Sequence, residues 1–276
     1  MFTLNCKGHL LQATRPLAMG IINITPDSFF ENSRQQSEDA ILYKAEQMLL
    51  DGASILDIGG QSTRPGSVAV SAEEEIARII KPIAALHKRF PEAVISVDTF
   101  YSNVAAEAVA TGASIINDIS GGKLDEAMLE TTGRLETPFI CMHMQGTPQT
   151  MQQFAQYDDV TLSVLDYFIE RIDACKKAGI KDVIIDPGFG FSKTTAHNLL
   201  LLKNMPALAI LDKPILAGLS RKGMVYKTLG TTADRALNGT TVFNTLALQN
   251  GAGILRVHDV KEAMEAITLF QSYQDA

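Results

Sequence analysis

The chain has 276 residues, of which 46% are hydrophobic and 20% are charged. This composition is typical of a globular protein and excludes a disordered one. The formal net charge of −7 argues against a surface that binds nucleic acid or anionic membranes, so an anionic ligand would need a local cluster of basic groups. Cys6, Cys141 and Cys175 show no pairing pattern. They are predicted to be free thiols in a reducing compartment, which favours a cytoplasmic protein.

The predicted elements begin with a small hairpin before Leu17. Eight short segments follow, each apolar without alternation and each followed by a pattern typical of a helix. Such strands are expected to be buried on both faces. Several of the helices end in Gly-Ala, at Gly52, Gly112 and Gly251, where glycine suits the left-handed residue that closes a helix. The predicted strands are Leu17–Ile22, Ser54–Ile58, Ala93–Val97, Ser114–Asn117, Pro138–Met142, Asp182–Ile185, Pro214–Leu219 and Gly253–Val257.

Eight strand–helix units in a chain of this length predict a single (β/α)8 barrel domain over residues 1–276, with the hairpin across its bottom. The alternative is a doubly wound open sheet, but its signature G-x-G-x-x-G is absent from the sequence. Within the second helix, Ser71 and Glu74 form a capping-box pattern, and Pro82 is expected to interrupt the helix. Asp158-Asp159 and Asp259 with Glu262 are expected to open two later helices.

Polar residues stand at the end of every predicted strand, where barrel enzymes carry their active sites. For any one of them, capping of the next helix is the better explanation, but a complete ring favours a polar pocket. No His/Cys group has zinc spacing, and neither G-x-S-x-G nor G-x-x-x-x-G-K-[ST] occurs. The ring consists of Asn23, Asp57, Asp98, Asn117, His143, Asp186, Ser220-Arg221-Lys222, and Arg256 with His258.

The ring divides by chemistry. Asp98, Asn117 and Asp186 in the middle of the chain are suited to a flat heterocycle with an amidine-like edge, because a carboxylate accepts two parallel N–H bonds. Late in the chain, Arg221, Lys222, Arg256 and His258 form a basic group that suits an anion such as phosphate, with ion pairing to acidic residues as the alternative.

Two long, polar connections, Thr25–Ser33 and Gly59–Ser67, follow the first two strands. Loops of this length on a compact barrel are predicted to be functional, with simple insertion as the alternative. They contain Phe29, Arg64 and Pro65, which are unusual at the tip of a passive loop.

These motifs, taken in order, resemble the dihydropteroate synthases of folate biosynthesis. The resemblance runs from about residue 17 to the last helix, and the first two motifs together are highly specific. The motifs are Met19-Gly20-Ile21-Ile22-Asn23-Ile24-Thr25-Pro26-Asp27-Ser28-Phe29, Asp57-Ile58-Gly59-Gly60-Gln61-Ser62-Thr63-Arg64-Pro65-Gly66, Ser96-Val97-Asp98-Thr99, Asn117-Asp118-Ile119-Ser120-Gly121-Gly122, Met142-His143-Met144-Gln145-Gly146-Thr147-Pro148, Asp186-Pro187-Gly188-Phe189-Gly190-Phe191, Ser220-Arg221-Lys222 and Arg256-Val257-His258-Asp259.

The resemblance implies a pterin-binding (β/α)8 barrel that joins 6-hydroxymethyl-7,8-dihydropterin diphosphate to 4-aminobenzoate, with Mg²⁺ as cofactor. It implies catalytic roles for Asp98, Lys222 and Arg256. For the pterin it implies Asp98, Asn117, Asp186 and Lys222, with Met142 and Arg256 on the ring faces. For the diphosphate it implies Asn23, Arg256 and His258, with Mg²⁺ bound through Asn23. For 4-aminobenzoate it implies Phe29, Thr63, Arg64, Pro65, Phe191, Ser220 and Lys222.

The family also implies a homodimer formed through the late helices. Residues Ala236, Thr240, Phe243 and Ala247 form one stripe there, which either serves the dimer or faces the barrel. An SN1-like displacement is expected, because diphosphate is a good leaving group and the electron-rich dihydropterin can stabilise the resulting cation. The arylamine is neutral at pH 7 and attacks without a strong general base. The alternative functions are a pterin-barrel methyltransferase, which has no diphosphate to hold, and a non-catalytic pterin-binding homologue, which would lack one of the pterin contacts.

Overall fold

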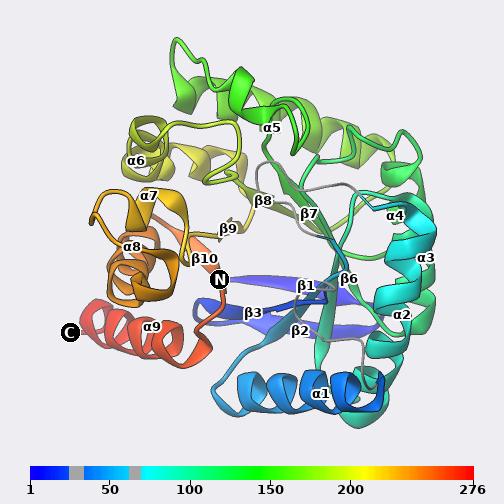
Figure 1. Cartoon of the computed structure of the whole chain (residues 1–276). Coiled ribbons are helices and arrows are strands. Elements are labelled where there is room, and N and C mark those ends of the chain that lie inside the picture. Colours follow the sequence, from blue (N-terminus) through cyan, green and yellow to red (C-terminus); the bar gives the residue numbers. More distant parts are fainter. Residues whose placement is uncertain (25–33, 62–69) are drawn as a thin grey trace.

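A computed structural model describes residues 1–24, 34–61 and 70–276 of the chain. The first two strands pair as an antiparallel hairpin, and the later strands alternate with helices that surround them (Figure 1). The strands are β1 (Phe2–Cys6), β2 (His9–Ala13), β3 (Leu17–Asn23), β4 (Ile55–Gly59), β5 (Val94–Asp98), β6 (Ile115–Asp118), β7 (Phe139–Met142), β8 (Val183–Asp186), β9 (Ile215–Ala217) and β10 (Ala252–Val257).

Within the described residues, eight parallel strands close into a barrel in the order β10-β3-β4-β5-β6-β7-β8-β9. The predicted (β/α)8 barrel and its N-terminal hairpin are therefore confirmed. Most strand bounds agree with the sequence pattern to within one residue; β9 is shorter than the predicted Pro214–Leu219. The glycines that precede β4, β6 and β10 have the predicted left-handed backbone, with φ of +100° at Gly52, +138° at Gly112 and +96° at Gly251.

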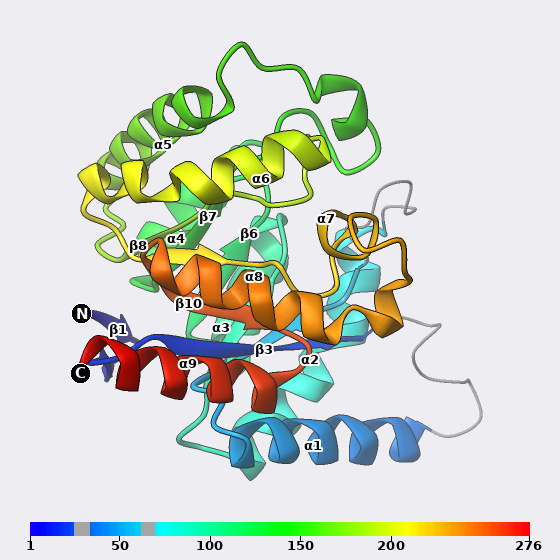
Figure 2. The ribbon, with the colours of Figure 1, turned by 90° about the vertical axis from the view of Figure 1, so that its left-hand side faces the viewer.

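The helices form the outer layer around the strands. In Figure 2 both termini lie at one end of the barrel, beside β1, and the short helix α7 lies at the opposite end. None of the described helices has the length and hydropathy needed to cross a membrane. The α-helices are α1 (Arg34–Leu50), α2 (Ala72–Arg89), α3 (Ser102–Thr111), α4 (Met128–Leu135), α5 (Val160–Lys177), α6 (Thr195–Asn204), α7 (Gly223–Tyr226), α8 (Leu237–Gln249) and α9 (Val260–Gln274).

The barrel interior begins with an apolar layer near the hairpin. Every barrel strand contributes at least one buried residue to it, including Met19, Ile55 and Ile254, and Leu4 and Cys6 of the hairpin belong to the same cluster. The hairpin therefore closes this end of the barrel, as predicted. Because successive strand residues point to opposite faces, the next inward-facing position on each strand lies two residues further on. This periodicity decides which polar residues enter the interior.

Pro82 does not interrupt α2, contrary to the sequence prediction. The helix continues from Ala72 to Arg89 with Pro82 buried inside it. A proline in a helix interior costs about 3 kcal/mol, but Ile79, Ile83 and Leu86 of the same helix are fully buried. Each such side chain contributes about 1.5–3 kcal/mol when buried, which outweighs the cost of the proline.

All three predicted helix starts are confirmed, and at two of them the side chain caps the helix. Ser71 Oγ accepts from Glu74 N at 3.3 Å, and Asp159 Oδ1 accepts from Thr161 N at 2.8 Å. Asp259 precedes α9 as expected, but its side chain makes no capping hydrogen bond. Its carboxylate is bonded to Arg221 instead.

Candidate active site

The candidate site lies two residues beyond the apolar layer, toward the carboxyl ends of the strands. The apolar layer includes Ile55, Ile115, Ile184 and Ile254. Two residues further along each of these strands, the next inward-facing side chain is charged or an amide. Asp98 lies one inward position beyond Ser96 on β5. A change from apolar to polar side chains at one level of the barrel therefore creates the site floor. The polar residues at that level are Asp57, Ser96, Asn117, Asp186 and Arg256, and the other strands carry Ile21, Met142 and Gly218 there.

Arg256 joins two of these carboxylates. Its Nε donates to Asp57 Oδ2 at 2.7 Å, and its Nη2 donates to Asp98 Oδ2 at 2.6 Å. The side chain of Arg256 is 20% exposed, while those of Asp57 and Asp98 are 0% and 10% exposed. Burial raises the pKa of the Asp98 carboxyl, and the Arg256 guanidinium opposes the rise. The sequence places Asp57 in the strand-end ring but gives it no role; its spacing from Ile55 is the signal that it faces inward.

Asn117 and Asp186 complete the wall formed by the middle strands. Asn117 Nδ2 donates to Asp57 Oδ2 at 3.2 Å. Asp186 Oδ1 accepts from Gly188 N at 2.8 Å. Burial raises the pKa of Asp186, and the neighbouring Lys222 opposes the rise. The structure therefore brings together Asp98, Asn117 and Asp186, as the sequence predicts for a heterocycle with an amidine-like edge.

Lys222 supplies a cation beside this wall. Its Nζ donates to the carbonyl oxygen of Phe189 and lies 4.6 Å from the centroid of the Phe191 ring. Burial lowers the pKa of Lys222 to about 8, while Asp186 opposes the decrease. A lysine with this pKa is mostly charged at pH 7 and loses its proton in mildly alkaline solution. Phe191, predicted for a second subsite, thus lies next to Lys222.

Asn23, Ser220 and His258 lie at the rim of the barrel. Asn23 ends β3 with its side chain exposed. Ser220 Oγ lies 3.0 Å from His258 Nδ1 and accepts from the backbone N of His258 at 3.2 Å. Burial lowers the pKa of His258 to about 4, and Arg256 and Lys44 lower it further. The expected cation at His258 is therefore a neutral imidazole at pH 7, since desolvation and nearby cations disfavour its charged form.

Arg221 does not belong to the basic group that the sequence suggests. Its Nε and Nη2 donate to the two carboxylate oxygens of Asp259 at 2.9 and 2.7 Å, and its Nη1 donates to the carbonyl oxygen of Asp234 at 3.1 Å. Arg221 is therefore engaged in an ion pair with an acidic residue, which was the alternative to anion binding for this group. Its role is to join the connection after β9 to the start of α9.

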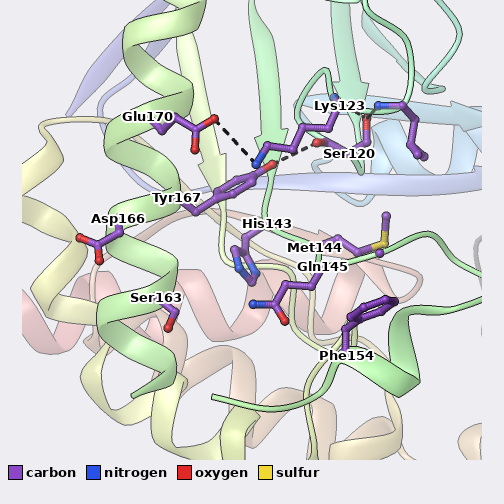
Figure 3. Close-up of a pocket in the computed structure, with 12 residues that line it drawn as sticks. Ser120, Lys123, His143, Met144, Gln145, Phe154, Ser163, Asp166, Tyr167 and Glu170 are labelled. Carbon is purple, nitrogen blue, oxygen red and sulfur yellow. Dashed lines mark hydrogen bonds and ion pairs between the residues drawn. The ribbon is translucent and has the colours of Figure 1, made fainter. Parts of the chain in front are cut away.

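His143 faces away from the barrel interior. It follows the inward-facing Met142, so the strand alternation points it toward the helices. Its ring stacks edge-on against Tyr167 of α5 with the centroids 4.8 Å apart. Both residues line a cavity of about 480 Å³ between α5 and the connections after β6 and β7. Figure 3 shows how the side chains that line this cavity lie. His143 is thus separate from the candidate site, which corrects its place in the predicted ring.

Four predicted residues of the second subsite, Phe29, Thr63, Arg64 and Pro65, lie outside the described residues.

Helix α2 anchors the described beginning of the second long connection. Gln61 Nε2 donates to Glu75 Oε2 at 3.0 Å, and Thr99 Oγ1 donates to the same oxygen at 3.1 Å. Arg78 Nη1 donates to the Gly60 carbonyl at 2.7 Å. Burial raises the pKa of Glu75 to about 8, and the hydrogen bond from Thr99 opposes the rise. Glu75 thus joins the ends of β4 and β5, a role that no sequence motif indicated.

A closed parallel barrel with buried charges gathered at the carboxyl ends of its strands defines a barrel enzyme with a polar small-molecule pocket. Residues 19–258 match the family described as pterin binding enzyme. Dihydropteroate synthase of Escherichia coli strain K12 is 41% identical over 268 residues, which cover 96% of this chain and 94% of that protein. The chain belongs to the dihydropteroate synthase family, whose members are transferases.

Two solved structures of dihydropteroate synthase from Xanthomonas albilineans show the same fold. One holds 4-aminobenzoic acid, has a TM-score of 0.92 and 40% sequence identity, and covers 99% of this chain and 98% of that one. The other is a complex with 7,8-dihydropteroate; it has a TM-score of 0.90 and 38% identity, and both chains are covered completely.

Proposed function

We propose that this chain joins 6-hydroxymethyl-7,8-dihydropterin diphosphate to 4-aminobenzoate, giving 7,8-dihydropteroate and diphosphate. The observation that carries this proposal is the group of buried side chains at the carboxyl ends of the strands. Arg256 donates to Asp57 and Asp98, Asn117 donates to Asp57, and Asp186 and Lys222 lie beside them. The near-complete coverage of the synthase relatives favours this reaction over a pterin-barrel methyltransferase or a non-catalytic homologue.

The pterin is proposed to bind in the barrel interior. Its amidine-like edge offers N–H donors to the Asp186 carboxylate, and Asn117 both donates and accepts. Lys222 offers an ammonium to a ring acceptor. Met142 is buried at the same level and is proposed to pack on a ring face. Arg256 is the residue proposed to cover the other ring face and reach the diphosphate.

The displacement is proposed to be dissociative. The bond between the pterin methylene and a diphosphate oxygen breaks, and its electron pair leaves with the diphosphate. The electron-rich dihydropterin and the nearby Asp98 carboxylate stabilise the resulting cation, since charge that develops in the transition state is stabilised by fixed charges around it. The neutral amine of 4-aminobenzoate then attacks the methylene carbon and loses a proton to solvent.

Mg²⁺ is proposed to accompany the diphosphate. The donors fit this ion, because Mg²⁺ binds through one or two protein oxygens and takes its other ligands from phosphate and water. Asn23 offers one exposed amide oxygen at the rim, and no cluster of three or more His, Cys, Asp or Glu is found in residues 1–24, 34–61 and 70–276. When bound, the ion would neutralise charge on the leaving diphosphate.

The proposed reaction is tested by incubating the protein with both substrates and Mg²⁺ and measuring 7,8-dihydropteroate and diphosphate. Equal amounts of the two products are expected. Consumption of the dihydropterin diphosphate without incorporation of 4-aminobenzoate would contradict the proposal.

His258 is expected to contribute to diphosphate binding through a hydrogen bond. The variant His258→Ala should bind diphosphate about 2- to 12-fold more weakly at pH 8, which corresponds to about 0.5–1.5 kcal/mol for one hydrogen bond. Because a bound anion favours the imidazolium, the difference between wild type and variant should grow as the pH falls toward 5. Calorimetric titration with diphosphate measures both effects. His9→Ala, in the hairpin at the other end of the barrel, is the control and should bind like wild type.

A homodimer through the late helices is also proposed. In the predicted stripe, Ala236, Thr240 and Ala247 are buried, and the half-buried Phe243 packs against the hydrophobic core. This stripe therefore faces the barrel, which was the stated alternative to a dimer contact. Support for a dimer comes instead from the outer faces of the packed helices α8 and α9. Exposed apolar side chains gather there, with exposed fractions of 50% at Val242, 44% at Leu246, 72% at Leu269 and 73% at Tyr273.

The proposed dimer predicts a sedimentation mass of twice 29.9 kDa at micromolar concentration. Leu246→Glu should shift the protein toward the monomer mass, because it places a charge in a buried apolar contact. Leu162→Glu on the exposed side of α5 is the matched control, since Leu162 is 57% exposed. A wild-type mass near 29.9 kDa would refute the dimer. The cytoplasmic location stays a prediction from the sequence.

A further inference from the structure

Lys193 is a buried lysine in the connection between β8 and α6. It is 4% exposed. Its Nζ lies 2.9 Å from His143 Nδ1 and donates to the carbonyl oxygens of Gly188 and Phe191, both at 3.1 Å. The Lys193 ammonium therefore links two backbone carbonyls within this connection, and it also links the connection to His143, the residue that follows β7.

The backbone of this connection has an unusual shape that needs such a tie. Gly188, Gly190 and Ser192 have φ of +69°, +84° and +47°, in the left-handed region that is costly for Ser192. A Cβ added at Gly188 would lie 2.0 Å from the His143 carbonyl oxygen, so the two connections pass in close contact. Without the Lys193 amine, the inward-pointing carbonyls of Gly188 and Phe191 would lose their donor, and buried polar groups need partners.

The same connection orients two residues of the proposed pterin site. Gly188 N donates to Asp186 Oδ1 at 2.8 Å. The Phe189 carbonyl accepts from Lys222 Nζ, and the Phe191 ring lies 4.6 Å from that nitrogen. Lys193 bonds to the carbonyl oxygens of Gly188 and Phe191, two of the residues that make these contacts. Its position therefore decides how the connection presents Asp186 and Lys222 to the barrel interior.

We propose that Lys193 is a positioning residue for the pterin subsite, which holds the Gly188–Phe191 connection so that Asp186 and Lys222 face the heterocycle. This proposal rests on the proposed function and deepens it. Lys193 does not touch the pterin; it acts through the backbone that it holds.

The hydrogen bond also fixes the state of His143. Burial lowers the pKa of His143 well below its ordinary value, and Lys193 and Lys123 lower it further. Burial lowers the pKa of Lys193 to about 7, while Asp186 opposes and Lys222 adds to the decrease. At pH 6.5 the lysine is therefore mostly charged and donates to Nδ1 of a neutral His143. The imidazole proton is then assigned to Nε2.

The first test compares Lys193→Met with wild type at pH 6.5. Methionine keeps an unbranched apolar side chain and removes the donors. Calorimetry should show at least tenfold weaker binding of 6-hydroxymethyl-7,8-dihydropterin, with binding of inorganic diphosphate changed less than twofold. Lys203→Met, at an exposed position in the last turn of α6, should match wild type for both ligands. Unchanged dihydropterin binding, or equal losses for both ligands, would overturn the proposal.

The second test measures the wild-type protein, and a variant is needed only to assign one signal. Nitrogen-15 spectra should show one histidine whose ring stays neutral between pH 6 and 8 and carries its proton on Nε2 at pH 6.5. Mutation of His143 to Phe assigns the signal by its disappearance. A proton on Nδ1, or titration near pH 6.5, would overturn the proposed contact. Failure of the proposed function is distinguishable, because the wild type would then form no 7,8-dihydropteroate in the synthase assay, whereas failure of the positioning role would leave dihydropterin binding equal in wild type and Lys193→Met.

Discussion

Replacement of Arg256 by methionine is expected to lower the free energy of unfolding by about 3–5 kcal/mol at pH 8, the usual cost of removing one partner from a buried ion pair. The guanidinium is bonded to Asp57 and Asp98, whose side chains are 0% and 10% exposed. In the variant both carboxylates would stay in the barrel interior without a cation. The same variant is expected to lose synthase activity, because Asp98 and Arg256 belong to the proposed catalytic group.

The loss of stability should depend on pH in a defined direction. Burial already raises the pKa of Asp98, and Arg256 opposes the rise. Without Arg256, the pKa of Asp98 in the folded state moves further above its value in the unfolded chain. Between these two pKa values the folded protein binds more protons than the unfolded one, so stability falls as the pH rises. The stability difference from wild type should therefore be largest at pH 8 and smaller at pH 5.

Urea unfolding at pH 5 and pH 8 measures this difference. Arg89→Met is the matched control, because the Arg89–Glu46 pair is 62% and 40% exposed and such surface pairs contribute about 0–1 kcal/mol. The double variant Asp57→Asn with Arg256→Met should recover part of the lost stability, since it removes one of the two unpaired charges. Equal losses at both pH values would show that lost packing, rather than unpaired charge, dominates.

The barrel could be predicted because its strands and helices differ in local pattern. Each strand is a short apolar run, and glycines such as Gly52 and Gly112 mark the ends of helices with a positive φ. The effect of Pro82 could not be read from the sequence. Its local cost is known, but the burial of Ile79 and Ile83 on the same helix depends on how α2 packs against the barrel.

The sequence predicts that the site lies at the ends of the strands. It does not predict which of these side chains face the interior or which of them form ion pairs with one another. Strand alternation separates Met142, which faces inward, from His143, which faces the helices. The sequence alone gave no reason to pair Arg221 with Asp259, because the two are 38 positions apart and meet only when β9 and β10 lie side by side. Lys193 was missed for a similar reason: its acceptors are mostly backbone carbonyls, which leave no mark in residue types.

Asp186→Asn is expected to weaken dihydropterin binding about 5- to 150-fold. The amide group would leave an N–H donor of the heterocycle without its carboxylate partner, and an unpaired buried polar group costs about 1–3 kcal/mol. The change should also alter the pKa values of Lys222 and Lys193. Asp186 raises the pKa of Lys222 and of Lys193, whose values are about 8 and about 7 because burial lowers them. Removing the Asp186 charge should lower both pKa values further.

The pH dependence of dihydropterin affinity therefore separates this effect from a simple loss of contact. In wild type, affinity should be highest below pH 7 and decrease as the pH rises through 8, because Lys222 then loses the proton it donates. In Asp186→Asn the decrease should begin at lower pH. Calorimetric titrations between pH 6 and 9 measure both curves. Asp173→Asn, at a 58% exposed position on α5, should follow the wild-type curve. A variant that is weaker by a constant factor at every pH would show that Asp186 does not control the charge of these lysines.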